Sequence, residues 1–85
     1  MQTNIVPVAV YPSTANVLYI RSITLGPPPS YYYELQNVDA EGVVTVLKNG
    51  NVNMTEEQWN NWSETVDDTE YQLDCISANL GLTRA

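Results

Sequence analysis

The residues of this chain that can do chemistry are few, and their types exclude most kinds of catalytic site. The sequence contains no histidine, so its serine and threonine hydroxyls lack the base that most often activates them. Lys48 is a single amine beside a turn that the sequence predicts at Asn49-Gly50. Cys75 follows Asp74, and a nearby carboxylate raises the pKa of a thiol, which favours a buried, unreactive cysteine. We therefore expect a protein that is not an enzyme and has no catalytic residue.

The carboxylates, the cysteine and the glycines also lack the spacing of a ligand site. Asp67, Asp68 and Glu70 could attract Ca²⁺, but they do not have the ligand spacing or the glycine of an EF-hand loop. A single cysteine can form neither an intramolecular disulfide nor an all-cysteine metal site. The four glycines all stand at predicted turns or helix caps, so no phosphate-binding loop is expected. The sequence predicts no metal and no cofactor.

Length and composition indicate one small folded domain, residues 1–85. With 44% hydrophobic and 15% charged residues, the chain is too apolar to be a disordered tail. A domain of this size buries about 60–65% of the surface that its unfolded chain exposes, so its core must be thin. The first residues lack the basic segment of an export signal, and no apolar run approaches the roughly 18 residues of a membrane helix. We expect a protein made in the cytoplasm, with no membrane partner.

The charge of the chain is strongly acidic and unevenly distributed. Ten acids face three bases, Arg21, Lys48 and Arg84, and give a net charge of -7. Because proteins bind the phosphates of nucleic acids through lysine and arginine, direct nucleic-acid binding is not expected. No base occurs in residues 49–83, which contain seven of the acids: Glu56, Glu57, Glu64, Asp67, Asp68, Glu70 and Asp74. This region is either a solvated acidic face or a surface complementary to a basic partner.

The elements that must position these residues differ between a strand-rich part, residues 1–53, and a helical part, residues 55–81. In the first part, β-branched and aromatic residues alternate with turn formers and predict strands at residues 5–11, 17–25, 31–38 and 43–48. Asn49-Gly50 favours a hairpin turn and so a short fifth strand at residues 51–53. Pro7 restricts the first strand to a sheet edge or a bulge. An antiparallel β-meander of four to five strands is predicted.

Two details of the strand-rich part concern its faces and its connections. Tyr31, Tyr33 and Leu35 alternate along the third strand and should share one face, while the intervening residues, Tyr32, Glu34 and Gln36, point to the other. The proline-rich residues 26–30 lie between two strands and are not flanked by a basic residue. We interpret them as a rigid connection rather than as a ligand for an aromatic groove.

The helical part begins at Thr55, which forms a capping-box pattern with Gln58. A second helix is predicted at residues 71–80, after a break at residues 63–68, and Gly81 should end it. Its stripe of apolar residues, Leu73, Ile76 and Leu80, should face the core. The predicted fold class is α+β, with the two short C-terminal helices packed on one face of the meander.

Trp59 and Trp62 are the two largest side chains of the helical part. They are three residues apart, so a helix would place them on the same side. In a chain without phenylalanine they can cover the core, because each buried indole removes about 150–250 Å² from water. Tryptophan is also a favoured interface residue. The sequence leaves open whether the pair belongs to the core or anchors a partner.

The first two strands are apolar on both sides, which two short helices cannot cover. An uncovered apolar patch indicates an interaction surface. The alternative is a sheet that curls tightly enough to bury both sides of its first hairpin. The candidate interface comprises apolar strand and connection residues: Val6, Val8, Val10, Leu18, Ile20, Pro27, Pro28, Pro29 and Tyr32.

Three motifs follow one another in the last third of the chain: a phrase MTxEQWxxW, an acidic bend, and a terminal helix ending IxxxLGL. Together they resemble small proteins encoded among the structural genes of tailed bacteriophages. The strands before Met54 carry no such resemblance. The matching residues are Met54, Thr55, Glu57, Gln58, Trp59, Trp62, Asp67, Asp68, Tyr71, Ile76, Leu80, Gly81 and Leu82.

The resemblance implies a non-enzymatic structural protein of a bacteriophage virion. A capsid decoration or cement protein, docked on a larger assembly through apolar strand surface, is the first expectation, and a tail or baseplate component is the alternative. The implied partners are other virion proteins, either major capsid or tail proteins. The chain would then be a homo-oligomer or a multicopy subunit located in the virion.

A function of another class is consistent with the acidic residues alone. An acidic inhibitor can mimic nucleic acid and block the basic groove of a nucleic-acid enzyme, which would use the base-free acidic stretch. Such binding weakens strongly with salt, whereas a mainly apolar contact survives moderate salt.

Overall fold

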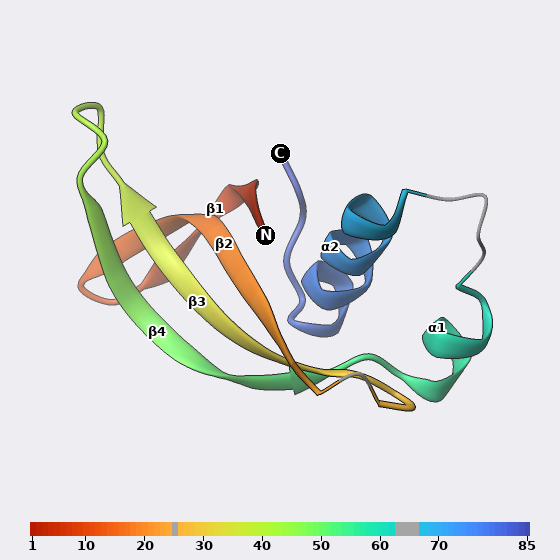
Figure 1. Ribbon diagram of the computed structural model, residues 1–85. Helices are drawn as coiled ribbons and strands as arrows, with labels where there is room; N and C mark the ends of the chain where they lie inside the picture. Colours follow the sequence, from red (N-terminus) through yellow and green to blue (C-terminus); the bar gives the residue numbers. More distant parts are fainter. Residues whose placement is uncertain (25, 63–66) are drawn as a thin grey trace.

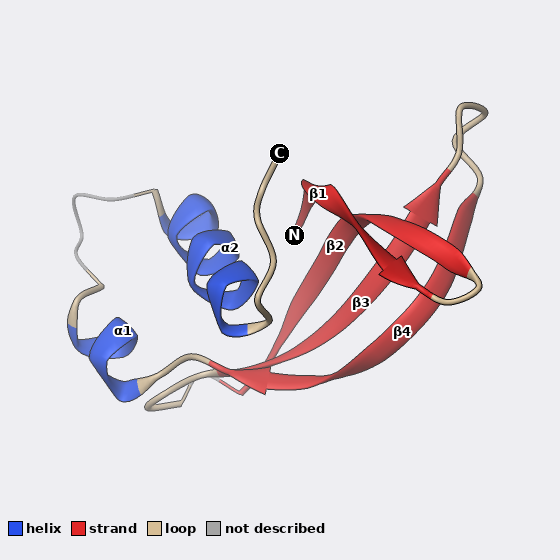
Figure 2. Ribbon diagram, turned by 180° about the vertical axis from the view of Figure 1, so that it is seen from behind, coloured by secondary structure: helices blue, strands red, loops and turns tan. Residues whose placement is uncertain are grey.

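The computed structural model describes residues 1–24, 26–62 and 67–85. Within these residues the chain forms four strands, β1 (Gln2–Val10), β2 (Ser13–Thr24), β3 (Ser30–Val38) and β4 (Val44–Asn53), and then two helices, α1 (Glu56–Asn60) and α2 (Asp68–Asn79). The strands lie in the order β1-β2-β3-β4, and each neighbouring pair is antiparallel. The predicted α+β class is confirmed, with helices and C-terminal segment beside the curled sheet (Figures 1 and 2).

β1 is an edge strand with a bulge, as Pro7 predicts. Asn4 lies opposite Val17 and Val8 opposite Ala15, so three residues of β1 face a single residue of β2. Pro7 stands within this irregular stretch, where its missing N–H interrupts no ladder pair. The bulge tilts the far end of the β1–β2 hairpin relative to the rest of the sheet.

Asn16 produces a second irregularity, on the other side of β2. The β2–β3 ladder ends at the pair Val17–Gln36. Beyond that pair, the Asn16 amide nitrogen donates to the carbonyl oxygen of Val38 at 2.9 Å, and its Oδ1 accepts from the Val38 N–H at 2.9 Å. The side chain therefore takes the place of a ladder partner and allows β2 to bend, and Ala15 is fully buried in the core.

The predicted hairpin turn at Asn49-Gly50 is wrong, and so is the fifth strand. β4 continues through both residues, and Gly50 lies opposite Tyr33. A Cβ at position 50 would stand 3.1 Å from Cε1 and 3.2 Å from the hydroxyl oxygen of Tyr33. The glycine therefore makes room for an aromatic ring across the ladder, and no turn forms.

The helix boundaries follow from their caps. The Gln58 N–H donates to Thr55 Oγ1 at 3.1 Å and the Thr55 N–H donates to Gln58 Oε1 at 2.9 Å, which confirms the capping box. α2 begins at Asp68, three residues before the predicted start, because Asp67 caps it by accepting from the Glu70 N–H at 2.9 Å. The predicted break at residues 63–68 lies mostly outside the described residues.

Gly81 ends α2 as predicted. Its φ is +72°, and the N–H groups of Gly81 and Leu82 donate to Ala78 and Ser77 at 3.0 and 2.8 Å. These two bonds are those of a Schellman motif, which needs a residue in the left-handed region at this position. The motif turns the chain back toward the sheet.

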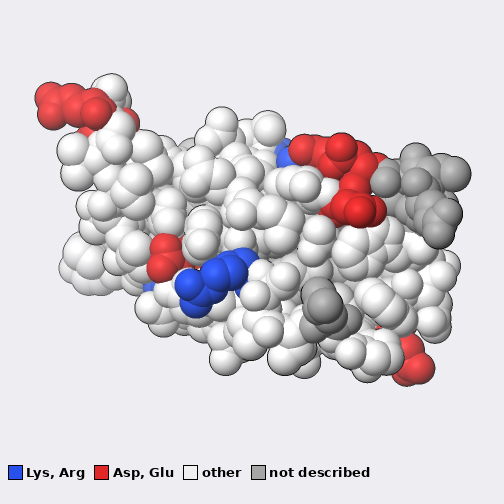
Figure 3. Space-filling view, viewed as in Figure 1, with Lys and Arg blue, Asp and Glu red and all other residues white. Residues whose placement is uncertain are grey.

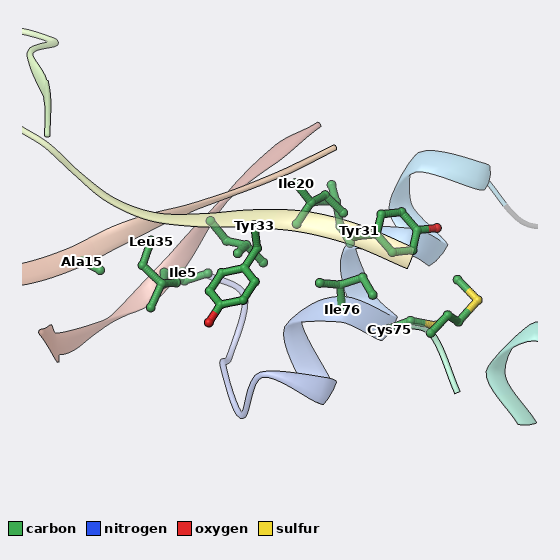
Figure 4. Packing of buried hydrophobic residues seen from close by; sticks show 11 residues of the cluster. Ile5, Ala15, Ile20, Tyr31, Tyr33, Leu35, Cys75 and Ile76 are labelled. Atoms are coloured by element: carbon green, nitrogen blue, oxygen red, sulfur yellow. The ribbon is translucent and has the colours of Figure 1, made fainter. Parts of the chain in front are cut away.

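The core lies between α2 and the concave face of the sheet. Figure 4 shows Cys75 and Ile76 of α2 beneath β3, near Tyr31 and Tyr33. As predicted, Tyr31, Tyr33 and Leu35 share this buried face. The remaining buried apolar members of the cluster are Ile5, Ala15, Leu18, Ile20, Met54 and Leu73.

The C-terminal segment covers part of the outer edge of β1. The Val6 N–H donates to the Thr83 carbonyl at 2.8 Å, and the Ala85 N–H donates to the Asn4 carbonyl at 3.0 Å. Arg84, which forms a bridge with Ile5, also pairs with Glu70 and Asp74 of α2, each at 2.7 Å. The last residues thus join the helix to the first strand.

Candidate protein–protein interface

The reactive side chains that the sequence offers are few, and the structure places the cysteine among them in the core. Cys75 is buried, and burial raises the pKa of its thiol, although a hydrogen bond with Tyr71 acts in the opposite direction. Among residues 1–24, 26–62 and 67–85, no three His, Cys, Asp or Glu side chains gather as metal ligands. In the same residues we find no helix with the length and apolar character required to cross a membrane.

Three residues of the predicted interface are buried, so their assignment to an exposed surface is wrong. Leu18 and Ile20 have an exposed fraction of 0%, and they lie opposite Leu35 and Tyr33 on the concave face. Because α2 and the curl of the sheet cover this face, both side chains belong to the core. Pro29 is buried as well, and its carbonyl accepts from the Met54 N–H at 3.0 Å.

Other candidates near the first hairpin differ in their exposure. Val6 is 49% exposed, beside the bulge of β1. Val8 and Val10 are half-buried and pack against the core, because the hairpin curls inward at Asn16. The curled-sheet interpretation therefore describes this hairpin better than a free apolar face does. Among the connection prolines, Pro27 is exposed and Pro28 is half-buried.

Tyr32 belongs to a polar network on the convex face. Its hydroxyl donates to Glu34 Oε2 at 2.6 Å, and Gln36 donates to Glu34 Oε1 at 2.8 Å, which confirms that these residues share one face. The two donors, Tyr32 first, lower the pKa of Glu34, and the bond to Glu34 raises the pKa of Tyr32. The Arg21 guanidinium lies 5.1 Å from the centroid of the Tyr32 ring. Tyr32 is thus held by polar partners rather than presented as an apolar anchor.

A group of exposed apolar residues at the start of β4 was not among the predicted interface residues. Val43, Val44 and Val46 are 55%, 53% and 45% exposed, and we call them the valine patch. Val44 lies opposite Val38 and Val46 opposite Gln36 on the ladder with β3. The alternation of valines in residues 43–46 was the available signal. The patch lies at the end of the β3–β4 hairpin that points away from α2 (Figure 1).

The tryptophans join the two helices. The rings of Trp59 and Trp62 meet edge to face at 5.9 Å, and Trp62 stacks on Tyr71 at 5.6 Å. Trp62 also donates to Asp68 Oδ1 at 3.1 Å, and the Tyr71 hydroxyl donates to the Gln58 carbonyl at 2.6 Å. Both indoles are half-buried and pack against the core. Of the predicted stripe, Leu73 and Ile76 are buried and Leu80 is half-buried.

The described acids of the helical part are exposed, and those of α2 gather on one side of the molecule (Figure 3). Two of them, Glu70 and Asp74, are paired with Arg84. The acidic surface therefore carries a positive charge although residues 49–83 contain no base, because the C-terminal segment places Arg84 beside α2. Glu64 lies outside the described residues.

No protein-family model, no curated protein and no solved structure matches this chain. Its function must therefore be argued from its own residues and surfaces.

Proposed function

We propose that this chain is a non-enzymatic structural protein of a tailed-bacteriophage virion, a capsid decoration or cement protein that docks on a larger assembly through apolar strand surface. The observation that carries the proposal is the valine patch, which exposes three apolar residues, two of them on β4 and the third, Val43, just before it. Clustered exposed apolar residues favour a protein contact, because burying them releases water from apolar surface.

The position of the patch supports a docking role. The molecule is elongated, 38 × 23 × 18 Å, and the acidic helices lie at the opposite end from the β3–β4 hairpin. A subunit that docks by its hairpin end would keep the acids of its helices in solvent, where their charge is least costly, and only Asp39 and Glu41 of the hairpin turn would lie near the contact. One end then serves attachment and the other serves solubility.

The resemblance in the last third of the chain supports the virion assignment in a specific way. Its residues are those that build the helical part: the Thr55–Gln58 capping box, the Trp62–Tyr71 stack and the Gly81 cap. They determine a local fold and not a reactive site. The resemblance therefore favours a shared small scaffold, and the attachment surface belongs to the strands.

Labelling of virions tests the proposal. Virions are purified from cells that carry this gene, treated with a gold-labelled antibody raised against the whole chain, and imaged by electron microscopy. Label over the capsid supports a decoration protein, and label on the tail or baseplate supports the alternative location. Chain found only in the particle-free fraction of the lysate would contradict both.

The exposed acids favour one second candidate, an acidic inhibitor that mimics nucleic acid. Glu56, Glu57, Asp67 and Asp68 are exposed, whereas the pairing of Glu70 and Asp74 with Arg84 reduces the free negative charge. Titration against a host nucleic-acid polymerase, at low and at high salt, tests this function. The inhibitor would bind tightly at low salt and lose affinity steeply as salt rises.

A further inference from the structure

We propose that the chain pairs with a second copy of itself, edge to edge, through residues 43–47 at the start of β4. The pairing would join two sheets across a two-fold axis. This pairing adds to the proposed function a specific contact between copies. The pairing rests on the proposed function only for the role that the dimer would have in a virion.

The two edges of the sheet are protected to different degrees. β1 carries a bulge and Pro7, and the C-terminal segment hydrogen-bonds to Asn4 and Val6 on its outer side. In the part of the chain that the structure describes, β3 is the only strand that pairs with β4. An unpaired edge presents N–H and C=O groups that can continue the sheet into another chain.

The two ends of β4 also differ. Leu47, the fourth residue of β4, is an extra residue in the ladder with β3, and the next residue, Lys48, is the only charged residue of the strand. A bulge and an edge lysine are the usual protections against unlimited pairing. Toward its end, Asn79 of α2 donates to the Asn53 carbonyl at 3.0 Å. Only the residues before Leu47 combine an open edge with the valine patch.

A two-fold axis at Thr45 makes this segment complementary to itself. An antiparallel pair centred there places Val44 opposite Val46 of the second copy, and Val43 opposite Leu47. Cross-strand pairs of β-branched residues stabilise a ladder. Val44 and Val46 of both copies would cover one another on the convex face, and the axis would close the assembly as a dimer.

The charges favour a second copy over an unrelated partner. Asp39 and Glu41 lie on the exposed turn that precedes β4, and no acid lies between Gly42 and Thr55. The register above would bring Lys48 of one copy to the turn of the other, which carries Glu41. The symmetry repeats this contact at both ends. Each copy would therefore supply a base and an acid at opposite ends of the paired segment, and a second copy would match both.

Solution mass of the full chain tests the pairing. Light scattering over a range of protein concentrations is expected to give the mass of a dimer for the wild type and of a monomer for Val44→Lys. The matched control is Ile23→Lys, since Ile23 on β2 is 52% exposed and Val44 is 53% exposed. The control should remain a dimer. A wild-type monomer at every concentration, or equal loss in both variants, would overturn the proposal.

A charge exchange keeps the test valid if Val44→Lys fails to fold. Lys48→Glu alone should weaken the dimer at low salt, and the double variant Glu41→Lys/Lys48→Glu should restore it, because the ion pair is reversed without a change of net charge. Failure of the double variant to restore the dimer counts against the register. Neither the mass measurement nor the charge exchange uses virions. If the chain is a dimer in solution but the antibody labels no virion, the proposed function is contradicted and the proposed dimer is not.

Discussion

At the residue scale, the contact between Tyr33 and Gly50 determines the path of β4. The Tyr33 ring occupies the space above the glycine, and Tyr33 is buried in the core cluster. Any side chain at position 50 must displace the ring or bend the strand. This contact explains why an Asn-Gly sequence that favours a turn is held in an extended conformation.

Gly50→Val should therefore destabilise the protein by about 1–3 kcal/mol, the usual cost of overpacking a core. The measurement is the midpoint of urea unfolding. The control is Asn51→Val, because Asn51 is exposed on the same strand, and it should leave the midpoint almost unchanged. Equal stability of Gly50→Val and wild type would show that the ring does not need this space.

Tyr31 gives the protein a pH dependence in the alkaline range. Burial, and to a lesser extent the charge of Cys75, raise its pKa from 10.0 to about 12, and its hydroxyl donates to Gln72 Oε1 at 2.6 Å. The folded protein holds this proton more tightly than the unfolded chain does. The resulting stabilisation is complete below pH 10 and is lost as the pH rises toward 12.

The free energy of unfolding should therefore fall between pH 10 and about 12, and it should fall less in Tyr31→Phe, which has no proton to lose. At neutral pH the variant should be less stable by about 1 kcal/mol, since it lacks the bond to Gln72. Urea unfolding at several pH values measures both effects. Parallel profiles for the two proteins would exclude Tyr31 as the titrating group.

At the element scale, the rings of Trp59, Trp62 and Tyr71 form an aromatic cluster that helps to hold the short α1. α1 has five residues and none of them is buried, so it cannot be stable by itself. Its capping box orders the first turn, and Trp59 and Trp62 connect it and the following residues to Tyr71 and Asp68 of α2. The helix depends on these contacts more than on its own hydrogen bonds.

Trp62→Ala should lower the stability by about 2 kcal/mol, which is less than the 3–5 kcal/mol typical of a fully buried tryptophan because Trp62 is only half-buried. It should also abolish the near-ultraviolet circular dichroism that arises from the Trp59–Trp62 contact. Asn60→Ala, an exposed change on α1, is the control. A small loss of stability with an unchanged spectrum would show that the cluster does not hold α1.

At the scale of the whole molecule, charge and apolar surface are separated along the long axis. The acids of α2 gather on one side of the molecule, while the valine patch lies on the far hairpin, which has its own acids in its turn. With a net charge of -7, copies of the chain repel one another at low salt unless they meet where acids are few. β4 is such a place.

Moderate salt should therefore leave the proposed dimer intact. Salt screens the general repulsion and weakens the two Glu41–Lys48 contacts, whereas the buried valines do not depend on ionic strength. Sedimentation velocity in low and in physiological salt should show the same dimer. Complete dissociation in physiological salt would indicate that charge, and not the valines, holds the copies together.

The sequence by itself determined the features whose causes lie within a few residues of one another. The Thr55–Gln58 cap, the Gly81 stop, the bulge at Pro7 and the alternation of Tyr31, Tyr33 and Leu35 each depend on local backbone geometry. Those predictions are confirmed. The two helices and the antiparallel order of the strands follow from the same local signals.

Tertiary structure decided what depends on distant partners. Gly50 remains in a strand because of Tyr33 on the neighbouring strand, β2 bends because Asn16 bonds to Val38, 22 residues away, and Arg84 reaches acids on α2. These contacts place Leu18 and Ile20 in the core and leave Val44 and Val46 exposed. Apolar character alone could not distinguish the two pairs, because burial depends on which face of each strand the rest of the chain covers.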